Sequence, residues 1–244
     1  MKIIALPFAG GNIYSFKELE KYVPNTIEWV TLELPGRGSR FGQPILENID
    51  SMVNDLFSQL KPHLNEEPYM IYGHSLGTLL GYELTKMLVK FKCQLPECLY
   101  FTGRGAPGTQ KIEKKSELPK DKFWKQVEEM GGLPSEILEH EELLELQYPI
   151  LKADFKALEE YNYEPMDTPF SIPIFICMGE DEIGEGKNKT LLASVRAWSK
   201  ETKFLQKVEC IPGNHFFILA HPKEVTSRIV NAFQKLVKSP TLII

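Results

Sequence analysis

The segment Gly73–Gly77, which reads glycine, histidine, serine, leucine, glycine, constrains the fold of this chain more than any other feature. The apolar run Tyr69–Tyr72 precedes it and a helix-like stretch, Leu76–Lys90, follows it. A serine flanked in this way predicts a strand, a sharp turn and a helix. The two glycines let the strand and helix backbones approach closely, because neither carries a Cβ. We therefore expect the Ser75 hydroxyl to be lifted above the end of a sheet.

Ser75 is the candidate nucleophile at this turn. A serine hydroxyl reacts poorly at neutral pH, so it needs a base that accepts its proton and an acid that orients the base. The N-terminus of the following helix favours negative charge beside the hydroxyl. In chains with this turn pattern the acid follows the serine and the histidine follows the acid.

Strand-like and helix-like segments alternate along the rest of the chain. Short apolar runs predict strands over 3–6, 27–34, 69–72, 98–102, 174–178 and 204–211. Helices are expected over 15–22, 49–64, 76–90, 189–200 and 225–237. Repeated strand–helix units predict an α/β fold with a mostly parallel sheet and helices on both faces. Ligands bind such sheets beyond the carboxyl ends of the strands.

One segment, from about 107 to 169, breaks this alternation. It contains no convincing strand and reads as charged helices over 120–130, 134–140, 141–148 and 152–161. Its many apolar side chains must be packed against something, and the segment leaves the core directly after a strand. We therefore predict a helical lid, residues 107–169, inserted into a core formed by 1–106 and 170–244. The alternative is that these helices belong to the main core.

Composition limits the possible classes of function. A chain of 244 residues with 43% hydrophobic and 25% charged residues is typical of a globular protein with one sizeable domain, with or without an insertion. A net charge of −5 argues against general binding to nucleic acid or to anionic membranes. The sequence contains no run of 18 apolar residues, so we expect no transmembrane helix.

The cysteines and the first residues indicate where the protein works. Cys93, Cys98, Cys177 and Cys210 are scattered and form no C-x-x-C motif, which is typical of reduced residues in a cytoplasmic protein. The apolar start, Met1–Pro7, is too short for a signal peptide and is better explained as a first strand.

Three histidines follow Ser75 in the chain: His140, His215 and His221. His215 lies in a loop directly after the predicted strand 204–211, at the ligand edge of the sheet, and is our candidate base. His140 lies in the predicted lid. His221 precedes a proline before the last helix and reads as a boundary residue.

The candidate acid follows the strand 174–178. That strand runs into Gly179 and then into three carboxylates, Glu180, Asp181 and Glu182. At least one of the three is expected to belong to a solvated acidic turn. Aspartate is the chemically usual choice, so residue type favours Asp181, and Glu182 stays open.

An oxyanion hole needs two backbone N–H groups aimed at the developing negative oxygen. One is predicted to be the N–H of Leu76, the residue after the nucleophile. The other is expected from the loop Pro7–Gly11 after the first strand. Phe8 is our first candidate for that donor and Ala9 the second.

Together these segments resemble the type II, or external, thioesterases of nonribosomal peptide and polyketide synthesis, which have the α/β-hydrolase fold. The matching segments are Leu6–Gly11, Leu34–Gly38 with Arg40, Gly73–Gly77, Met130–Pro134 and Gly213–Phe217. The family usually has aspartate three residues after the glycine that ends the strand. In this chain that position is Glu182, with Asp181 beside it, so the resemblance favours Glu182 slightly.

The resemblance implies a reaction and a partner. Ser75 and His215 would hydrolyse an acyl thioester through an acyl-serine intermediate, without a metal or a diffusible cofactor. The thiol would be the 4′-phosphopantetheine arm of an acyl or peptidyl carrier protein, and the role would be removal of wrong or stalled acyl groups. A monomer is the family-level expectation, with no nucleic acid or membrane as partner.

The sequence also allows three other functions. The chain would then be a medium-chain acyl thioesterase of fatty acid synthesis, a broad carboxylesterase, or an inactive scaffold that binds protein. Arg37, Arg40 and Arg104 are expected either to contact a phosphate of the carrier arm or, preferably, to pair with carboxylates. Lysines near the start of the lid are expected to form a solvated helix face, or else to steer an acidic carrier. These are Lys111, Lys114, Lys115, Lys120, Lys122 and Lys125.

Overall fold

The computed structural model describes residues 1–109, 113–131 and 140–238. Its centre is a six-stranded sheet in which every neighbouring pair is parallel, in the order β2-β1-β3-β4-β5-β6. The predicted parallel α/β architecture is therefore confirmed. The strands are β1 (Lys2–Leu6), β2 (Glu28–Thr31), β3 (Tyr69–His74), β4 (Cys98–Thr102), β5 (Ile174–Gly179) and β6 (Glu209–Ile211).

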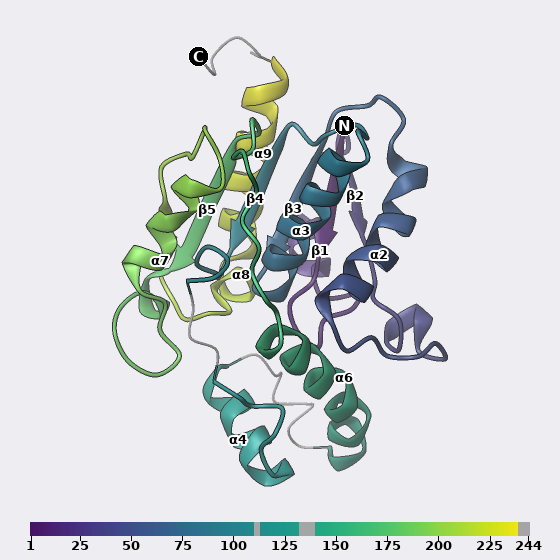
Figure 1. Cartoon of the computed structure of the whole chain (residues 1–244), viewed down its shortest axis with the longest axis vertical. Coiled ribbons are helices and arrows are strands. Elements are labelled where there is room, and N and C mark those ends of the chain that lie inside the picture. Colours follow the sequence, from purple (N-terminus) through teal and green to yellow (C-terminus); the bar gives the residue numbers. More distant parts are fainter. Residues whose placement is uncertain (110–112, 132–139, 239–244) are drawn as a thin grey trace.

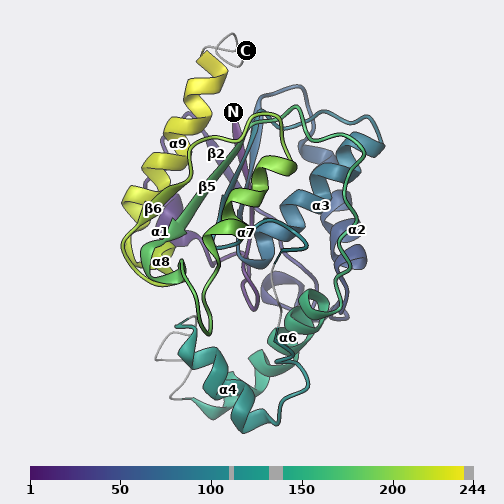
Figure 2. The same cartoon turned by 60° about the vertical axis from the view of Figure 1, so that its left-hand side comes forward.

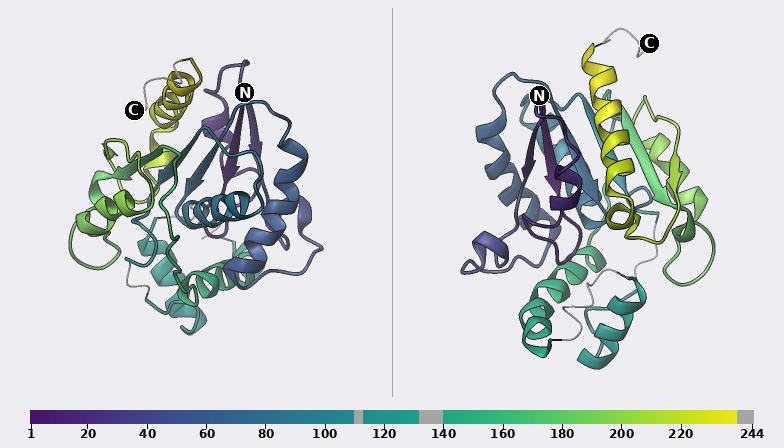
Figure 3. Two further views of the ribbon diagram at one scale, coloured as in Figure 1. Left: turned by 45° about the horizontal axis from the view of Figure 1, so that its top comes forward. Right: turned by 180° about the vertical axis from the view of Figure 1, so that it is seen from behind.

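Helices cover both faces of this sheet (Figures 2 and 3). One face carries α2 (Ile49–Leu60), α3 (Leu76–Lys90) and α7 (Leu192–Arg196). The other face carries α1 (Lys17–Glu20), α8 (Phe217–Ala220) and α9 (Pro222–Lys238). Short 3-10 turns complete the described elements: η1 (Gly38–Arg40), η2 (Lys61–His63), η3 (Glu180–Glu182) and η4 (Ala197–Lys200).

The two faces bury separate hydrophobic clusters because side chains alternate along each strand. Ile4 and Leu6 of β1 join the cluster under α2 and α3. Ile3 and Ala5 join the cluster under α8 and α9. Strands buried on both faces are continuous apolar runs, which is why short apolar segments predicted them.

Two further helices, α4 (Lys120–Glu129) and α6 (Glu141–Glu159), lie beyond the carboxyl ends of the strands (Figure 1). The ring of Phe123 on α4 packs edge-on against Tyr148 and Phe155 of α6, with ring centroids 5.2 and 5.8 Å apart. No strand occurs among the described residues between 107 and 169. Most of the predicted helix 134–140 lies outside the described residues.

Several predicted boundaries were wrong. The two helices expected over 141–148 and 152–161 form one helix, α6, that continues through Pro149. Proline removes one backbone donor, but burial of Ile150, Leu151 and Phe155 holds the helix together across it. The strand expected over 204–211 is reduced to β6, because its first part lies at the sheet edge and makes only an isolated bridge there. The helices expected over 15–22 and 189–200 are likewise shorter.

Among the described residues, none of the helices combines the length and the apolar character needed to span a bilayer.

Candidate active site

Ser75 occupies a strained turn between β3 and α3. Its φ is 55° and its ψ is −110°, a conformation that L-residues rarely adopt. Its N–H donates to the Thr102 carbonyl at 2.9 Å, which ties the turn to the end of β4. A Cβ at Gly73 would lie 2.3 Å from the Gly77 carbonyl oxygen, and one at Gly77 would lie 1.9 Å from the Leu6 carbonyl oxygen. Both glycines are therefore required by the close approach of strand and helix.

His215 and Glu182 are hydrogen-bonded partners at the ends of β6 and β5. The His215 Nδ1 donates to Glu182 Oε2 at 2.7 Å, and the other carboxylate oxygen accepts the Gly179 N–H at 2.7 Å. Glu182 is 3% exposed. Because Nδ1 carries the proton in this bond, Nε2 of the neutral ring is left as the proton acceptor.

Of the two acids that the sequence left open, the structure places Glu182 and not Asp181 against the imidazole. The side chain of Asp181 is exposed, and its N–H donates to the Gly213 carbonyl. A Cβ at Gly179 would lie 2.5 Å from the Asn214 carbonyl oxygen, so glycine lets the histidine loop approach the end of β5. The other candidate bases lie apart from this bond: His140 is an exposed residue before α6, and His221 ends α8.

His74 is a second imidazole at the site, and sequence reasoning missed it. Its ring is fully buried, with its centroid 4.9 Å from that of His215, and its Nδ1 lies 2.9 Å from Thr102 Oγ1. Burial lowers the pKa of His74 well below its ordinary value, and the nearby His215 lowers it further. His74 is therefore neutral. Its place inside the Gly73–Gly77 segment was the signal available in the sequence.

The loop Pro7–Gly11 lies beside the Ser75 turn, because β1 pairs with β3 and Leu6 is in register with Gly73. The Gly11 N–H donates to the Phe8 carbonyl at 2.9 Å, which closes the loop into a tight turn. The Phe8 ring packs edge-on against His74 and against Phe216, the neighbour of His215. The predicted donors Phe8 and Ala9 thus belong to a loop in contact with the site, and Leu76 begins α3 as a buried residue.

The three arginines differ in their partners. Arg37 pairs with Asp154 of α6, and Arg40 pairs with Asp55 of α2. Arg104 is buried without an ion-pair partner in the part of the chain that the structure describes, and burial lowers its pKa to about 10. Pairing with carboxylates was thus the right expectation for Arg37 and Arg40.

The lysines near the start of α4 mostly have local partners. Lys114 pairs with Glu117, Lys120 pairs with Glu145, and the Lys115 ammonium lies over the Phe155 ring. Lys111 lies outside the described residues. Lys114 and Lys115 precede α4 and Lys115 is half-buried, so the expectation of a solvated helix face was wrong for these two lysines.

Comparisons with known proteins show the family to which the chain belongs. A sequence model of the thioesterase domain family matches residues 1–233. The gramicidin S biosynthesis protein GrsT of Aneurinibacillus migulanus is 30% identical over 219 residues, covering 89% of this chain and 83% of that protein. The medium-chain S-acyl fatty acid synthase thioesterase of Rattus norvegicus is 23% identical over 228 residues, covering 91% and 83%.

Among solved structures, ClbQ from the colibactin NRPS/PKS pathway superposes with a TM-score of 0.88 at 26% identity, covering 96% of this chain and 97% of that one. The α/β-hydrolase fold and the family resemblance predicted from the sequence motifs are both confirmed. This chain belongs to the thioesterase family.

Proposed function

We propose that this protein hydrolyses acyl groups from the 4′-phosphopantetheine arm of carrier proteins, as an editing thioesterase of nonribosomal peptide or polyketide synthesis. The hydrogen bond between His215 and Glu182 carries the proposal, together with the 4.9 Å between the ring centroids of His215 and His74, the residue before the strained Ser75. Membership of the thioesterase family supports the reaction type. GrsT is named a gramicidin S biosynthesis protein and ClbQ comes from the colibactin NRPS/PKS pathway, and both names support the substrate class.

In the proposed mechanism, Ser75 Oγ attacks the thioester carbonyl carbon while His215 Nε2 accepts its proton. The N–H groups of Leu76 and of Phe8 or Ala9 stabilise the negative oxygen. The carbon–sulfur bond breaks and His215 returns the proton to the leaving thiol. His215 then takes a proton from water, whose oxygen attacks the acyl carbon. The bond between that carbon and Ser75 Oγ breaks, the acid is released, and His215 returns the proton to Ser75 Oγ. Glu182 holds the imidazole in the tautomer that both steps need.

We further propose that residues 107–169 form a lid inserted between the core segments 1–106 and 170–244. The position of α4 and α6 beyond the carboxyl ends of the strands supports this division (Figure 1). Phe123 and Val127 of α4 belong to the same buried cluster as α2 and α3, which indicates that the lid is packed onto the core in this conformation.

We also propose that the protein acts as a monomer in the cytoplasm. All four cysteines are free thiols, and Cys98 and Cys177 are buried, as expected of a chain that folds under reducing conditions. Light scattering of the purified protein at micromolar concentration tests the monomer.

The experiment that tests the function compares three substrates: an acyl group on a carrier protein, the same acyl group on coenzyme A, and a simple ester. We expect the highest kcat/KM for the acyl carrier and a trapped acyl adduct on Ser75. Ser75→Ala should abolish turnover of all three. Turnover that persists in this variant would overturn the mechanism, and a preference for the simple ester would overturn the substrate class.

The second candidate is a medium-chain acyl thioesterase of fatty acid synthesis, because the rat enzyme of that name is similar over most of its length. The same assay separates the two with a series of unbranched acyl chains. A sharp preference for medium chains would favour fatty acid synthesis, whereas broad tolerance of short acyl groups would favour editing.

A further inference from the structure

An ion pair is buried beneath the loop that we assign to the oxyanion hole. Arg37 and Asp154 are 3% and 0% exposed, and two parallel hydrogen bonds of 2.7 and 2.8 Å join them. Arg37 lies in the loop after β2, whereas Asp154 lies on α6. A bidentate arginine–carboxylate pair fixes direction as well as distance. The pair therefore sets the position of α6 relative to the core.

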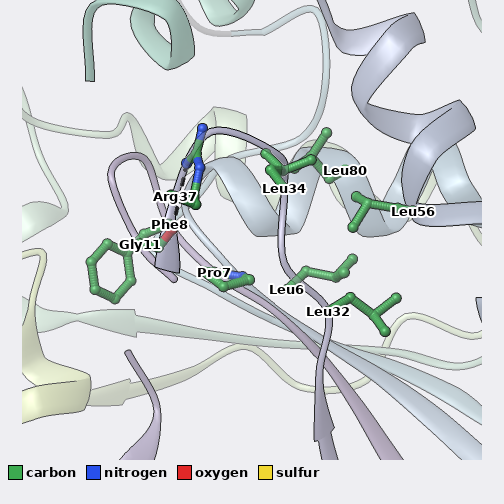
Figure 4. A pocket seen from close by; sticks show the side chains of 9 residues that line it. All are labelled: Leu6, Pro7, Phe8, Gly11, Leu32, Leu34, Arg37, Leu56 and Leu80. Carbon is green, nitrogen blue, oxygen red and sulfur yellow. Dashed lines mark hydrogen bonds between the residues drawn. The ribbon is translucent and has the colours of Figure 1, made fainter. Parts of the chain in front are cut away.

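Both partners also contact the backbone of the loop after β1. Asp154 Oδ2 accepts the Gly10 N–H at 2.7 Å. Arg37 donates to the Gly11 carbonyl at 3.4 Å, and Figure 4 shows its side chain reaching this loop. Gly10 and Gly11 directly follow Phe8 and Ala9, the candidate donors. The ion pair thus holds the two residues on which the direction of those N–H groups depends.

One face of α6 makes further contacts with the loop after β1. Gln147, Leu151 and Asp154 are spaced by four and three residues, so they lie on one side of the helix. Gln147 donates to the Gly10 carbonyl at 3.5 Å. A Cβ at Gly10, whose φ is +76°, would lie 2.7 Å from the Leu151 side chain. The loop backbone is therefore pressed directly against the helix.

The space beside the loop is also closely filled. A cavity of about 10 Å³ borders the loop and is lined by leucine side chains, Pro7 and Arg37 (Figure 4). This is about the space that a single water needs. The loop has little room to retreat, so its position follows that of α6.

We propose that Arg37 and Asp154 are positioning residues for the oxyanion hole, and that α6 is a working part of the active site as well as a cover. The pair touches no reacting atom. It holds the Gly10 and Gly11 backbone so that the preceding N–H groups point at the developing oxyanion. This inference rests on the function proposed above.

Asp154→Asn tests the proposal, with Asp55→Asn as its matched control. Asp55 forms a bidentate pair of 2.6 and 2.8 Å with Arg40 of the same loop, and its carboxylate accepts its hydrogen bonds from Arg40 and Gln59 rather than from Pro7–Gly11. We expect Asp154→Asn to lower kcat by about 100-fold with little change in KM, the effect of a displaced catalytic group. Asp55→Asn should stay within about threefold of the wild type.

A trifluoromethyl ketone provides a readout that general destabilisation does not move. Ser75 Oγ adds to its carbonyl carbon and forms a hemiketal whose oxygen occupies the oxyanion hole. The pKa of that oxygen, followed by ¹³C NMR, should be low in the wild type and in Asp55→Asn, and higher in Asp154→Asn. Equal values in all three proteins would overturn the proposal.

A double variant guards against misfolding. Arg37→Met with Asp154→Leu removes both buried charges together, which commonly preserves stability, but leaves the Gly10 N–H without its acceptor. If this variant melts like the wild type and recovers full kcat, the pair is merely structural and the proposal fails. Failure of the proposed function appears differently. The wild type would form no hemiketal at Ser75 if the mechanism is wrong, and would prefer the simple ester if the substrate class is wrong.

Discussion

Glu182 lies almost fully buried, and each of its oxygens accepts one hydrogen bond, from the Gly179 N–H and from the His215 ring. Its carboxylate is thereby fixed in place before any substrate arrives. The neighbouring Asp181 is exposed and takes part through its backbone alone. Two adjacent acids of similar chemistry are thus given different roles by their surroundings.

Glu182→Gln should lower kcat by roughly 10³- to 10⁴-fold, because an amide no longer selects the tautomer in which His215 Nε2 accepts the proton. Asp181→Asn is the matched control and should leave kcat within about twofold. Steady-state hydrolysis of one acyl thioester by the two variants and the wild type measures both effects. A larger loss of kcat in Asp181→Asn than in Glu182→Gln would show that the acid is Asp181 and not Glu182.

His74 should make stability depend on pH. Its pKa in the folded state lies below the ordinary value of 6.5 that it regains on unfolding. Below pH 6.5 the unfolded chain therefore binds a proton that the folded protein does not. The free energy of unfolding should fall as pH falls, by up to about 1.4 kcal/mol per pH unit from this group.

Urea unfolding at pH 7.5, 6.5 and 5.5 measures that slope. We expect a shallower slope for His74→Asn than for the wild type. His140→Asn changes an exposed histidine and should keep the wild-type slope. Identical slopes in His74→Asn and the wild type would show that His74 titrates normally in the folded protein.

The sequence predicts the reacting residues of the site better than the residues that hold them in position. Ser75 and His215 could be predicted because each follows a recognisable strand and turn. The contact of Arg37 with Asp154 could not be predicted, because it joins positions 117 residues apart and has no local pattern. His74 was missed for a similar reason, since only the folded structure brings a second imidazole against it.

At the scale of the elements, the crossing of α3 over β1 depends on one glycine. Gly77 lies in the first turn of α3, directly against the Leu6 carbonyl. Gly77→Ala should lower the free energy of unfolding by about 3 kcal/mol or more through overpacking, although alanine is the better helix former.

Gly42→Ala provides the contrast, because a Cβ at Gly42 would meet nothing within 4 Å. This change should alter stability by less than about 0.5 kcal/mol. Urea unfolding of both variants measures the difference, and equal effects would mean that the helix shifts to admit a methyl group at Gly77.

Element types were predictable where burial determines them. β1, β3, β4 and β5 are apolar runs buried on both faces, and α2 has apolar residues at helical spacing together with an Asn48 cap that accepts the Ser51 N–H. Predictions failed at edges and in α6. Pairing at a sheet edge and packing across Pro149 depend on distant partners that a local window does not contain.

At the scale of the whole molecule, the site is built from loops near positions 8, 75, 182 and 215, which meet at one edge of the sheet. The helices α4 and α6 lie across the same edge (Figure 1). Under the proposed function, we expect the acyl chain of a substrate to lie between these helices and the strand ends.

Trp124 on α4 provides a probe for this arrangement, because it packs against Phe123 and Tyr148. A long-chain phosphonate bound covalently to Ser75 should shift tryptophan emission, whereas a methyl phosphonate should not. The shift should vanish in Trp124→Phe, which retains Trp29 and Trp198. If the long chain leaves wild-type emission unchanged, α4 does not respond to the substrate and the lid assignment fails.

The positive φ of Ser75 has a consequence for every reaction cycle. Such a backbone conformation costs about 1 to 3 kcal/mol. Cooperative folding of the surrounding sheet supplies that energy once, when the chain folds. Arriving thioesters then encounter an alcohol that is already aimed, so none of their own affinity is consumed in bending the chain.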